Sequence, residues 1–472
     1  MRMLSTTLND FEAQSRQTME WIAEYLRDNR AYPVLARVTP GEITAALPID
    51  APEDGEPFEA IFGDFERIIM PGITHWNHPR FFGYFAISAA PVAVLAEALS
   101  ATLDVNAMLW RTSPSATELE EVVLRWLRQL IGLPPTFSGI VYDTASIGGF
   151  TALAGAREAL DLDIRERGMT ARDLPPLRVY ITEHTHSHIE KAALTLGVGR
   201  ENVVQIPVDN AFCMNAAALR SQIAADEAAG MRPMCIVATV GTTSTTSADP
   251  LIDVAHVARE KHCWLHVDAA YAGVAAMLPE FRHLFEGIEH ADSIVVNPHK
   301  WLFVPIDFSA LYVRKPEILH RAFSLVADYL ATPEHVRNYM DYGLQLGRRF
   351  RALKLWFVLR HLGARTIRET LRRHIALAQE FAQWVDAEPN WKVMAPHPFS
   401  VVCFRHAPAG AGAEEIDAHN LRIMNAVNEM GKAFISSTQL DQRVALRLAI
   451  GNYRTTRDDV LVAWRLLREA AS

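Results

Sequence analysis

The stretch that decides the fold is Asp292-Ser293-Ile294-Val295-Val296-Asn297-Pro298-His299-Lys300-Trp301. Its apolar run predicts a short buried strand that ends at Pro298. Lys300 follows at once, past the carboxyl end of that strand, where ligands bind in open α/β sheets. A lysine held among apolar neighbours loses its proton more easily, because desolvation disfavours the ammonium ion, and its neutral amine can form a Schiff base with an aldehyde. From this stretch alone, a solvated surface lysine remains the commoner alternative.

The bulk composition narrows the class of protein. The chain has 472 residues, 50% of them hydrophobic, which is ample for a large core and long for one domain. Its net charge is −9 and its 46 basic residues are spread along the chain, so a nucleic-acid partner is not expected. No window approaches the roughly 20 apolar residues of a membrane span. The first ten residues contain no apolar core of a secretory signal, and the four cysteines show no paired spacing. We therefore expect reduced thiols in a cytoplasmic protein without a membrane partner.

Short apolar runs alternate with helical patterns through the middle of the chain. Helices are predicted around 186–195, 215–229, 251–261 and 278–288. Strands are predicted at Leu177–Ile181, Val203–Ile206, Cys235–Val240, Trp264–Val267, Ile294–Val296 and Ala310–Val313. This alternation predicts an α/β fold with a mostly parallel sheet flanked by helices.

Polar side chains follow four of these strands at the point where each strand ends. They belong to the segments 183–188, 241–244, 268–271 and 297–300. Because the carboxyl ends of parallel strands meet at one edge of a sheet, we expect these segments to lie close together. Four such loops at one edge predict an active site.

Two further segments add candidate binding groups. Thr144 and Ser146 precede a helical run, so their hydroxyls and the helix amides could bind a phosphate, although a capped helix without a ligand looks much the same. No P-loop lysine and no G-x-G-x-x-G pattern accompanies them, which argues against a nucleoside triphosphate or a dinucleotide. The aromatic loop His75–Phe85 either lines a pocket for a flat ligand or plugs a domain edge. Its two histidines lack a third ligand nearby, so no metal is expected.

One cofactor uses all of these groups, namely pyridoxal 5′-phosphate (PLP). It requires an amine for its aldehyde, an acid for its pyridine nitrogen, a phosphate site and a flat neighbour for its ring. Lys300 supplies the amine, Asp268 the acid and His186 the flat neighbour, while Ala145 and Ser146 lie at the phosphate end. An ionised Asp268 would keep the pyridine nitrogen protonated, and the ring would then act as an electron sink.

Several of these motifs together resemble those of a known enzyme family. Asn297-Pro298-His299-Lys300-Trp301 and His266-Val267-Asp268-Ala269-Ala270-Tyr271-Ala272-Gly273 resemble the group II PLP-dependent decarboxylases. The similarity runs nearly end to end and is greatest to the aromatic L-amino-acid decarboxylases. It includes His75-Trp76-Asn77-His78-Pro79, the segment 113–120, Gly241-Thr242-Thr243 and Leu346-Gly347-Arg348-Arg349-Phe350-Arg351.

The resemblance implies a role for each matching position. Lys300 would hold the cofactor aldehyde, Asp268 would pair with the pyridine nitrogen and His186 would stack on the ring. Tyr329 would be the catalytic tyrosine of a mobile loop. The other cofactor-binding positions would be Ala145, Ser146, Thr243, Asn297 and His299. The substrate-binding positions would be Trp76, Tyr84, Phe85, Asn106 and Met108, of which the last two stand where animal enzymes reach into the neighbouring subunit.

The resemblance also implies the architecture. It predicts the type I fold of PLP-dependent transferases, similar to aspartate aminotransferase, in a homodimer. We expect an N-terminal helical arm over residues 1–85, a large PLP-binding domain over 86–350 and a small α+β domain over 351–472. The apolar face of residues 11–26 has no evident partner in the arm itself, and it could pack either on a second subunit or on the body of the same chain.

The expected reaction is decarboxylation of tryptophan, tyrosine, phenylalanine or dihydroxyphenylalanine to the corresponding amine. The alternative on the same scaffold is an aromatic acetaldehyde synthase, against which Tyr329 argues, because that activity goes with phenylalanine at this position. A glutamate-type decarboxylase is disfavoured by the aromatic pocket stretch, and a non-enzymatic scaffold by the presence of Lys300 and Asp268. Departures from the family lie around the substrate and the phosphate, such as Asp143-Thr144 in place of Gly-Ser. They leave open which aromatic amino acid is preferred.

Overall fold

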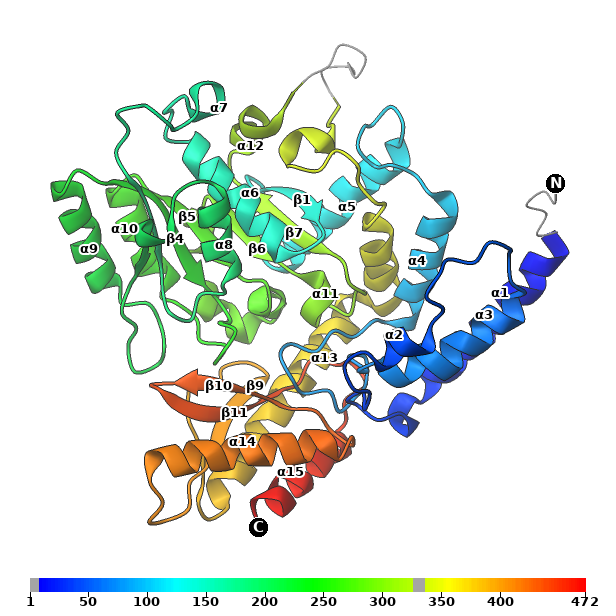
Figure 1. Ribbon diagram of the computed structural model, residues 1–472. Coiled ribbons are helices and arrows are strands. Elements are labelled where there is room, and N and C mark those ends of the chain that lie inside the picture. Colours follow the sequence, from blue (N-terminus) through cyan, green and yellow to red (C-terminus); the bar gives the residue numbers. More distant parts are fainter. Residues whose placement is uncertain (1–7, 326–335) are drawn as a thin grey trace.

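A seven-stranded sheet forms the centre of the computed structural model, which describes residues 8–325 and 336–472 (Figure 1). The strand order is β1-β7-β6-β5-β4-β2-β3. The strands are β1 (Ser138–Tyr142), β2 (Leu177–Ile181), β3 (Val203–Gln205), β4 (Arg232–Thr239), β5 (Trp264–Asp268), β6 (Ser293–Val296) and β7 (Ser309–Val313). The five strands from β3 to β6 in this order are parallel, and β7 is antiparallel to both β6 and β1.

The predicted mostly parallel sheet is therefore confirmed, with each predicted strand present to within a few residues at its ends. The sequence analysis missed β1. Its apolar run is only Ile140-Val141-Tyr142, preceded by Ser138 and Gly139, which is too short to distinguish from a loop.

Helices cover both faces of this sheet. One face packs against α5 (Pro114–Leu130), α9 (Ala216–Ala228), α10 (Leu251–Glu260) and the first part of α13 (Ala352–Ala387). The other face packs against α6 (Ala145–Glu158), α8 (His188–Thr195) and α12 (Pro316–Phe323). In β6, Ile294 and Val296 point to the first face and Val295 to the second, as the two-residue period of a strand requires. All three are fully buried, which explains the continuous apolar run in the sequence.

The helix predicted around 278–288 is wrong. Three-ten helices occupy this region instead, over Ala272–Met277, Pro279–Phe285 and Ile288–His290. Pro279 and Gly287 interrupt any longer helix: Gly287 has a φ of 96°, and a Cβ there would lie 2.6 Å from the backbone of Ile252. The three-ten turns follow from this close approach of the chain to α10.

A second, antiparallel sheet lies below the first in Figure 1. Its order is β10-β11-β9-β8, with strands β8 (Trp391–Val393), β9 (Val401–His406), β10 (Ser436–Leu440) and β11 (Arg443–Ala449). Helices α14 (Ala413–Glu429) and α15 (Arg457–Ala471) pack on it. The long helix α13 runs from the large sheet to this small one and kinks at Gly363, where φ is 68°.

The N-terminal helices form a projecting part of the molecule, at the right of Figure 1. They are α1 (Leu8–Arg27), α2 (Glu42–Ala46) and α3 (Phe58–Asp64); α4 (Pro91–Leu103) follows and packs against α13. Short helices α7 (Ile164–Arg167) and α11 (Pro298–Trp301) complete the described α-helices. The domain boundaries near residues 85 and 350 stay a prediction, and Tyr329 lies outside the described residues. Of the described helices, none combines the length and the apolar character needed to cross a membrane.

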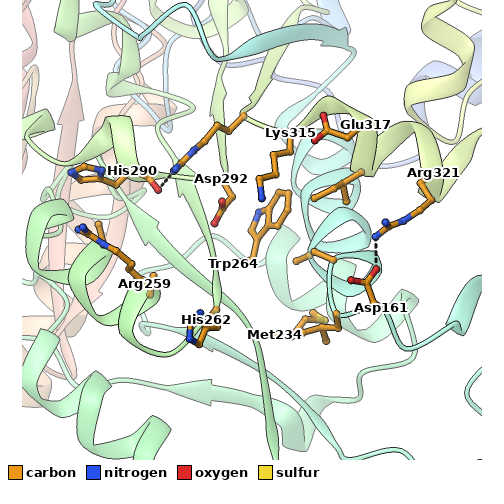
Figure 2. A pocket seen from close by; sticks show the side chains of 18 residues that line it. Asp161, Met234, Arg259, His262, Trp264, His290, Asp292, Lys315, Glu317 and Arg321 are labelled. Carbon is orange, nitrogen blue, oxygen red and sulfur yellow. Dashed lines mark hydrogen bonds and ion pairs between the residues drawn. The ribbon is translucent and has the colours of Figure 1, made fainter.

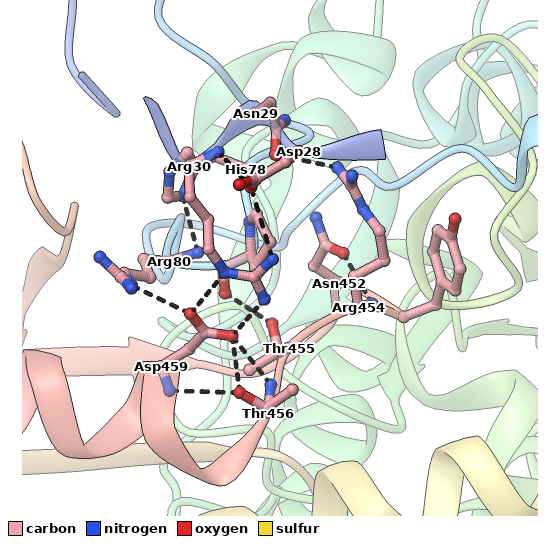
Figure 3. Close-up of polar contacts among 12 residues, drawn as sticks. Asp28, Asn29, Arg30, His78, Arg80, Asn452, Arg454, Thr455, Thr456 and Asp459 are labelled. Atoms are coloured by element: carbon pink, nitrogen blue, oxygen red, sulfur yellow. Dashed lines mark hydrogen bonds and ion pairs between the residues drawn. The ribbon is translucent and has the colours of Figure 1, made fainter. Parts of the chain in front are cut away.

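A buried carboxylate on helix α15 binds two arginines of the N-terminal part of the chain (Figure 3). Asp459, in the first turn of α15, is 1% exposed and accepts hydrogen bonds from Arg30 at 2.9 Å and from Arg80 at 2.9 Å. It also caps α15 through a reciprocal pair of bonds with Thr456. Although burial opposes the charge, the bonds from Arg30 and Thr456 hold the pKa of Asp459 at about 2. Arg454 extends the contact, donating to the carbonyls of Leu26 and Asn77.

Candidate active site

A cavity lies where β4, β5 and β6 reach the carboxyl edge of the large sheet. It is lined by Phe85, Thr144, Ala145, Ser146, His186, His188, Thr239, Gly241, Thr243, Asp268, Ala270, Tyr271, Asn297, His299 and Lys300. The four polar segments that the sequence analysis singled out thus meet at one place. Of the fourteen residues predicted for the site, nine line this cavity.

Lys300 is placed in the cavity by the short helix α11, which directly follows β6. Its backbone N–H donates to the carbonyl of Asn297 at 2.9 Å, which fixes the turn after the strand. Burial lowers the pKa of the Lys300 ammonium, and the positive charge of Arg447 adds to this, although Asp268 opposes both. Its Nζ lies 5.0 Å from the centre of the Phe85 ring. Lys300 is half-buried, and an amine with a lowered pKa is suited to attack an aldehyde.

Asp268 ends β5 beside Lys300 and is 5% exposed. One carboxylate oxygen accepts the backbone N–H of Ala270 at 3.0 Å, which orients the side chain. Burial alone would raise the pKa of this carboxyl, but His188 and Lys300 outweigh it, so that the pKa lies below its usual value. Asp268 is therefore ionised at neutral pH and can pair with a protonated ring nitrogen.

His186 lies in the loop between β2 and α8. Its Nδ1 accepts the backbone N–H of His188 at 3.2 Å and lies 3.0 Å from Nδ1 of the His188 ring. Burial lowers the pKa of His186, and Lys300 lowers it further. The imidazole is thus neutral and flat, which suits stacking on an aromatic cofactor.

The start of α6 supplies a possible phosphate site. Helix α6 is 14 residues long and begins at Ala145, and no side chain caps its first turn. The N–H groups of that turn are therefore available for an anion, and they carry the positive end of the helix dipole. The Asp143 carboxylate accepts the backbone N–H of Thr144 at 2.6 Å, so this amide is already bonded within the chain.

Asn297 and His299 are held by neighbouring groups. The Ser309 hydroxyl donates to Asn297 at 2.6 Å, and His299 Nδ1 accepts the N–H of Phe308 at 3.0 Å. Aromatic rings form another part of the lining: the ring centres of Phe85 and Tyr271 lie 3.9 Å apart, and Trp301, which does not line the cavity, stacks on Tyr271 at 4.8 Å. Amine, acid, flat imidazole and helix start are all present around one cavity, so the residues of this site fit PLP.

Some predicted residues do not line this cavity within one chain. Trp76 stacks on Phe81 and Tyr84, with ring centres 4.5 and 5.5 Å apart, and Tyr84 is 55% exposed. Asn106 donates to the sulfur of Met108 at 3.3 Å, and both lie outside the lining. Tyr329 falls outside the described residues.

The sequence analysis missed Arg447, which reaches the site from β11 of the second sheet. It is 3% exposed, and its guanidinium lies 4.8 Å from the centre of the Phe85 ring. Its Nε donates to the carbonyl of Ser244 at 3.0 Å, while Nη2 is buried without a partner among the described residues. Burial lowers the pKa of Arg447. The available signal was an arginine within the otherwise apolar run Val444–Ile450. Nη1 of Arg447 donates to the carbonyl of Tyr84, so Nη2 is the group of this buried guanidinium that is left to bind an anion.

A second and larger cavity than the one around Lys300 lies at the amino edge of the same sheet (Figure 2). Its volume is about 780 Å³, and it surrounds Trp264 and Asp292, at the starts of β5 and β6. Arg321 pairs there with Asp161 at 2.8 Å, and Arg314 is bound by backbone carbonyls. No residue predicted for the site lines it, and the amine that faces Asp292 there, that of Lys315, belongs to an exposed residue. We therefore place the chemistry at the smaller cavity around Lys300.

The comparisons with known proteins agree with this geometry. The model of the pyridoxal-dependent decarboxylase conserved domain matches residues 40–407. A tryptophan decarboxylase from Camptotheca acuminata is 37% identical over 98% of this chain and 94% of its own. A phenylacetaldehyde synthase from Arabidopsis thaliana is also 37% identical, over 96% and 94%. The crystal structure of Oryza sativa TDC with PLP and tryptamine superposes with a TM-score of 0.95 at 32% identity, covering 99% of this chain and 98% of that one.

Proposed function

Because the chain belongs to the family of pyridoxal-dependent decarboxylases, we propose that it converts an aromatic L-amino acid to the corresponding arylalkylamine and carbon dioxide. PLP is its cofactor. The observation that carries the proposal is that half-buried Lys300 and buried Asp268 line one cavity together with Phe85 and Tyr271. The amino-acid class is supported by the relatives, which include a tryptophan decarboxylase and a structure with tryptamine.

When bound, PLP supplies an electron sink for the electron pair that remains on Cα as carbon dioxide leaves. Each of the chain's own groups has a separate task in this proposal. Lys300 would hold the cofactor aldehyde through its amine. Asp268 keeps a proton on the pyridine nitrogen, since an ionised carboxylate in a dry site favours the protonated partner. His186 confines the ring from one side.

Arg447 is our candidate for holding the substrate carboxylate. Its Nη2 needs a partner that the described part of the chain does not provide, and an α-carboxylate is an anion of the right size. Arg447 does not line the cavity itself, but its guanidinium lies against Phe85, which does, so that the carboxylate and the aromatic side chain of the substrate would occupy neighbouring places. Desolvation of Arg447 strengthens its attraction for an anion.

The second candidate function is an aromatic acetaldehyde synthase. Relatives with this activity match the chain as well as the decarboxylases do, so the comparisons favour neither. In that reaction the amino acid, oxygen and water give aldehyde, carbon dioxide, ammonia and hydrogen peroxide. Tyr329 supports the decarboxylase. The resemblance assigns to this tyrosine the return of a proton to Cα, and protonation of Cα competes with its reaction with oxygen.

One product assay separates these functions. The purified holoenzyme is supplied with tryptophan, tyrosine, phenylalanine, dihydroxyphenylalanine or glutamate, and amine, aldehyde, peroxide and carbon dioxide are measured. The proposal expects one amine per carbon dioxide with at least one aromatic substrate and no turnover of glutamate. Aldehyde and peroxide in equal amounts to carbon dioxide would establish the synthase instead, and turnover of glutamate alone would refute the aromatic assignment.

We also infer that two copies form the active unit. Large apolar side chains are exposed on the arm and on α4: Phe11 at 62%, Ile49 at 100%, Ile61 at 55%, Leu95 at 50% and Leu103 at 58%. Such a surface is costly in water and is typical of a subunit interface. Asn106 and Met108, which the resemblance assigns to the neighbouring site, follow directly after α4. Sedimentation of the holoenzyme during assay tests this, and a fully active monomer would contradict it.

A cytoplasmic location is the remaining part of the proposal. Its support is the cysteines, which are all free, as expected in a reducing compartment. Fractionation of the source cells tests it directly, and recovery outside the cytoplasm would overturn it.

A further inference from the structure

His188 is a buried titratable group in the active site with no role in the proposed reaction. It is 4% exposed and begins α8, two residues after His186. Two contacts join it to His186. Its backbone N–H donates to His186 Nδ1 at 3.2 Å, and its ring Nδ1 lies 3.0 Å from the same atom. Three nitrogens thus meet at one point, and their protons must be distributed so that each contact has a donor and an acceptor.

Only one distribution satisfies both contacts. The backbone N–H always carries its proton, so His186 Nδ1 must be the acceptor and cannot be protonated. The His188 Nδ1 atom shares the single lone pair of His186 Nδ1 with that N–H, and it must itself carry a proton, because two unprotonated nitrogens at 3.0 Å would repel. In a neutral imidazole one nitrogen carries the single proton. His188 is therefore protonated on Nδ1, and His186 on Nε2.

Both rings are neutral at physiological pH, so these tautomers are the states that matter. Burial lowers the pKa of His186 and brings that of His188 to about 4. The His188 ring occupies space that a glycine in α6, Gly149, leaves free because it has no side chain. A Cβ on Gly149 would lie 2.6 Å from His188 Nε2, which no real side-chain contact tolerates. The His188 ring is thus held in place from behind by α6 and from the front by His186.

We propose that His188 is a positioning residue that fixes His186 as the Nε2–H tautomer and holds its ring against the cofactor. The Nε2–H then lies on the ring edge away from His188, where it presents a hydrogen-bond donor to a ligand in the cavity. His188 itself touches His186 rather than the reacting atoms. The rate effects expected below rest on the proposed function, whereas the tautomers do not.

The tautomers are measured directly by nitrogen NMR of the holoenzyme with ¹⁵N-labelled histidine at neutral pH. The His186 signals are identified by their loss in His186→Gln, and the His188 signals by their loss in His188→Asn. We expect protonated Nδ1 and bare Nε2 for His188, and the reverse for His186. A protonated Nδ1 on His186, a bare Nδ1 on His188 or a doubly protonated ring would overturn the inference, whether or not the protein is a decarboxylase.

Substitutions test the positioning role. His188→Leu removes the donor, and we expect kcat to fall about tenfold, as for the loss of one hydrogen bond, with broadened His186 signals. His188→Asn retains an N–H near the same place and should recover kcat to within about threefold of wild type. Gly149→Ala, which displaces the ring from behind, should reproduce His188→Leu. Equal rates for the Leu and Asn variants, or unchanged His186 signals in His188→Leu, would contradict the proposal.

A matched control comes from the same loop. His184 is also buried, at 8% exposed, and packs edge-on against Phe212 rather than on His186. His184→Leu should leave the His186 signals and kcat unchanged. A shift of the His186 signals in this control equal to that in His188→Leu would show that any loss of packing in the loop has the same effect, and would refute the specific role of His188.

Discussion

Replacing Asp268 by asparagine tests the acid of the site with the smallest change of shape. The amide oxygen of asparagine can still accept the backbone N–H of Ala270, which is 3.0 Å from the carboxylate in the native protein. The turn after β5 is therefore kept, and only the negative charge is lost. Lys300 remains able to hold the cofactor aldehyde, so the variant should still bind PLP.

The expected fall in kcat follows from the burial of Asp268, which is 5% exposed. Two opposite charges in a charge-assisted bond of about 2.8 Å attract by about 6 kcal/mol at an effective dielectric constant of about 20. A neutral hydrogen bond made by the asparagine keeps about 1 to 2 kcal/mol of this attraction. The net loss of about 4 kcal/mol corresponds to a fall in kcat of about a thousandfold.

The assay is the release of carbon dioxide from the preferred amino acid, with the PLP content of each preparation measured by absorbance. Asp226→Asn is the matched control. Asp226, on α9, is also a buried carboxylate, 6% exposed, but it accepts hydrogen bonds from Tyr180 of β2 and from Gln222 of α9, and it does not line the cavity. Its kcat should stay within about twofold of wild type. A near-normal kcat for Asp268→Asn at full PLP content would refute the electron-sink argument.

Three further outcomes are expected. Asp459→Asn should lower the free energy of unfolding by about 2 kcal/mol in denaturant titrations above pH 4, and the difference should vanish toward pH 2, because a carboxyl with a lowered pKa stabilises the fold only while it is ionised. Glu280→Gln is the control for Asp459→Asn: Glu280 pairs with Arg372 at the surface, so its replacement should change the free energy of unfolding much less. Arg447→Gln should raise KM for the amino acid more than tenfold while PLP still binds, and an unchanged KM would exclude it as the carboxylate site. Tyr329→Phe should yield aldehyde and peroxide in place of much of the amine in air, and an unchanged amine yield would show that another group returns the proton.

The sequence predicted the large sheet and the cofactor side of the site because both depend on local patterns. Lys300 and Asp268 follow directly after buried strands, so the carboxyl ends of those strands place them together without further information. Arg447 could not be placed in this way. It comes from a strand of another sheet, and its approach to Phe85 depends on how the two sheets pack.

Close backbone approaches were also beyond the sequence patterns. The three-ten turns in place of a helix around 278–288 follow from the contact of Gly287 with α10, which no apolar period records. The pairing of His186 with His188 depends on the space that Gly149 leaves in α6. In both places a glycine was visible in the sequence, but the neighbour that requires it was not.

The most direct test of the site is to map where the cofactor is attached. The yellow holoenzyme is reduced with borohydride, digested and analysed by mass spectrometry for the peptide that carries the reduced pyridoxyl group. We predict a single modified peptide containing Lys300, and no modification and no turnover in Lys300→Ala. Attachment to any other lysine, or full activity in Lys300→Ala, would contradict the assignment of this cavity as the active site.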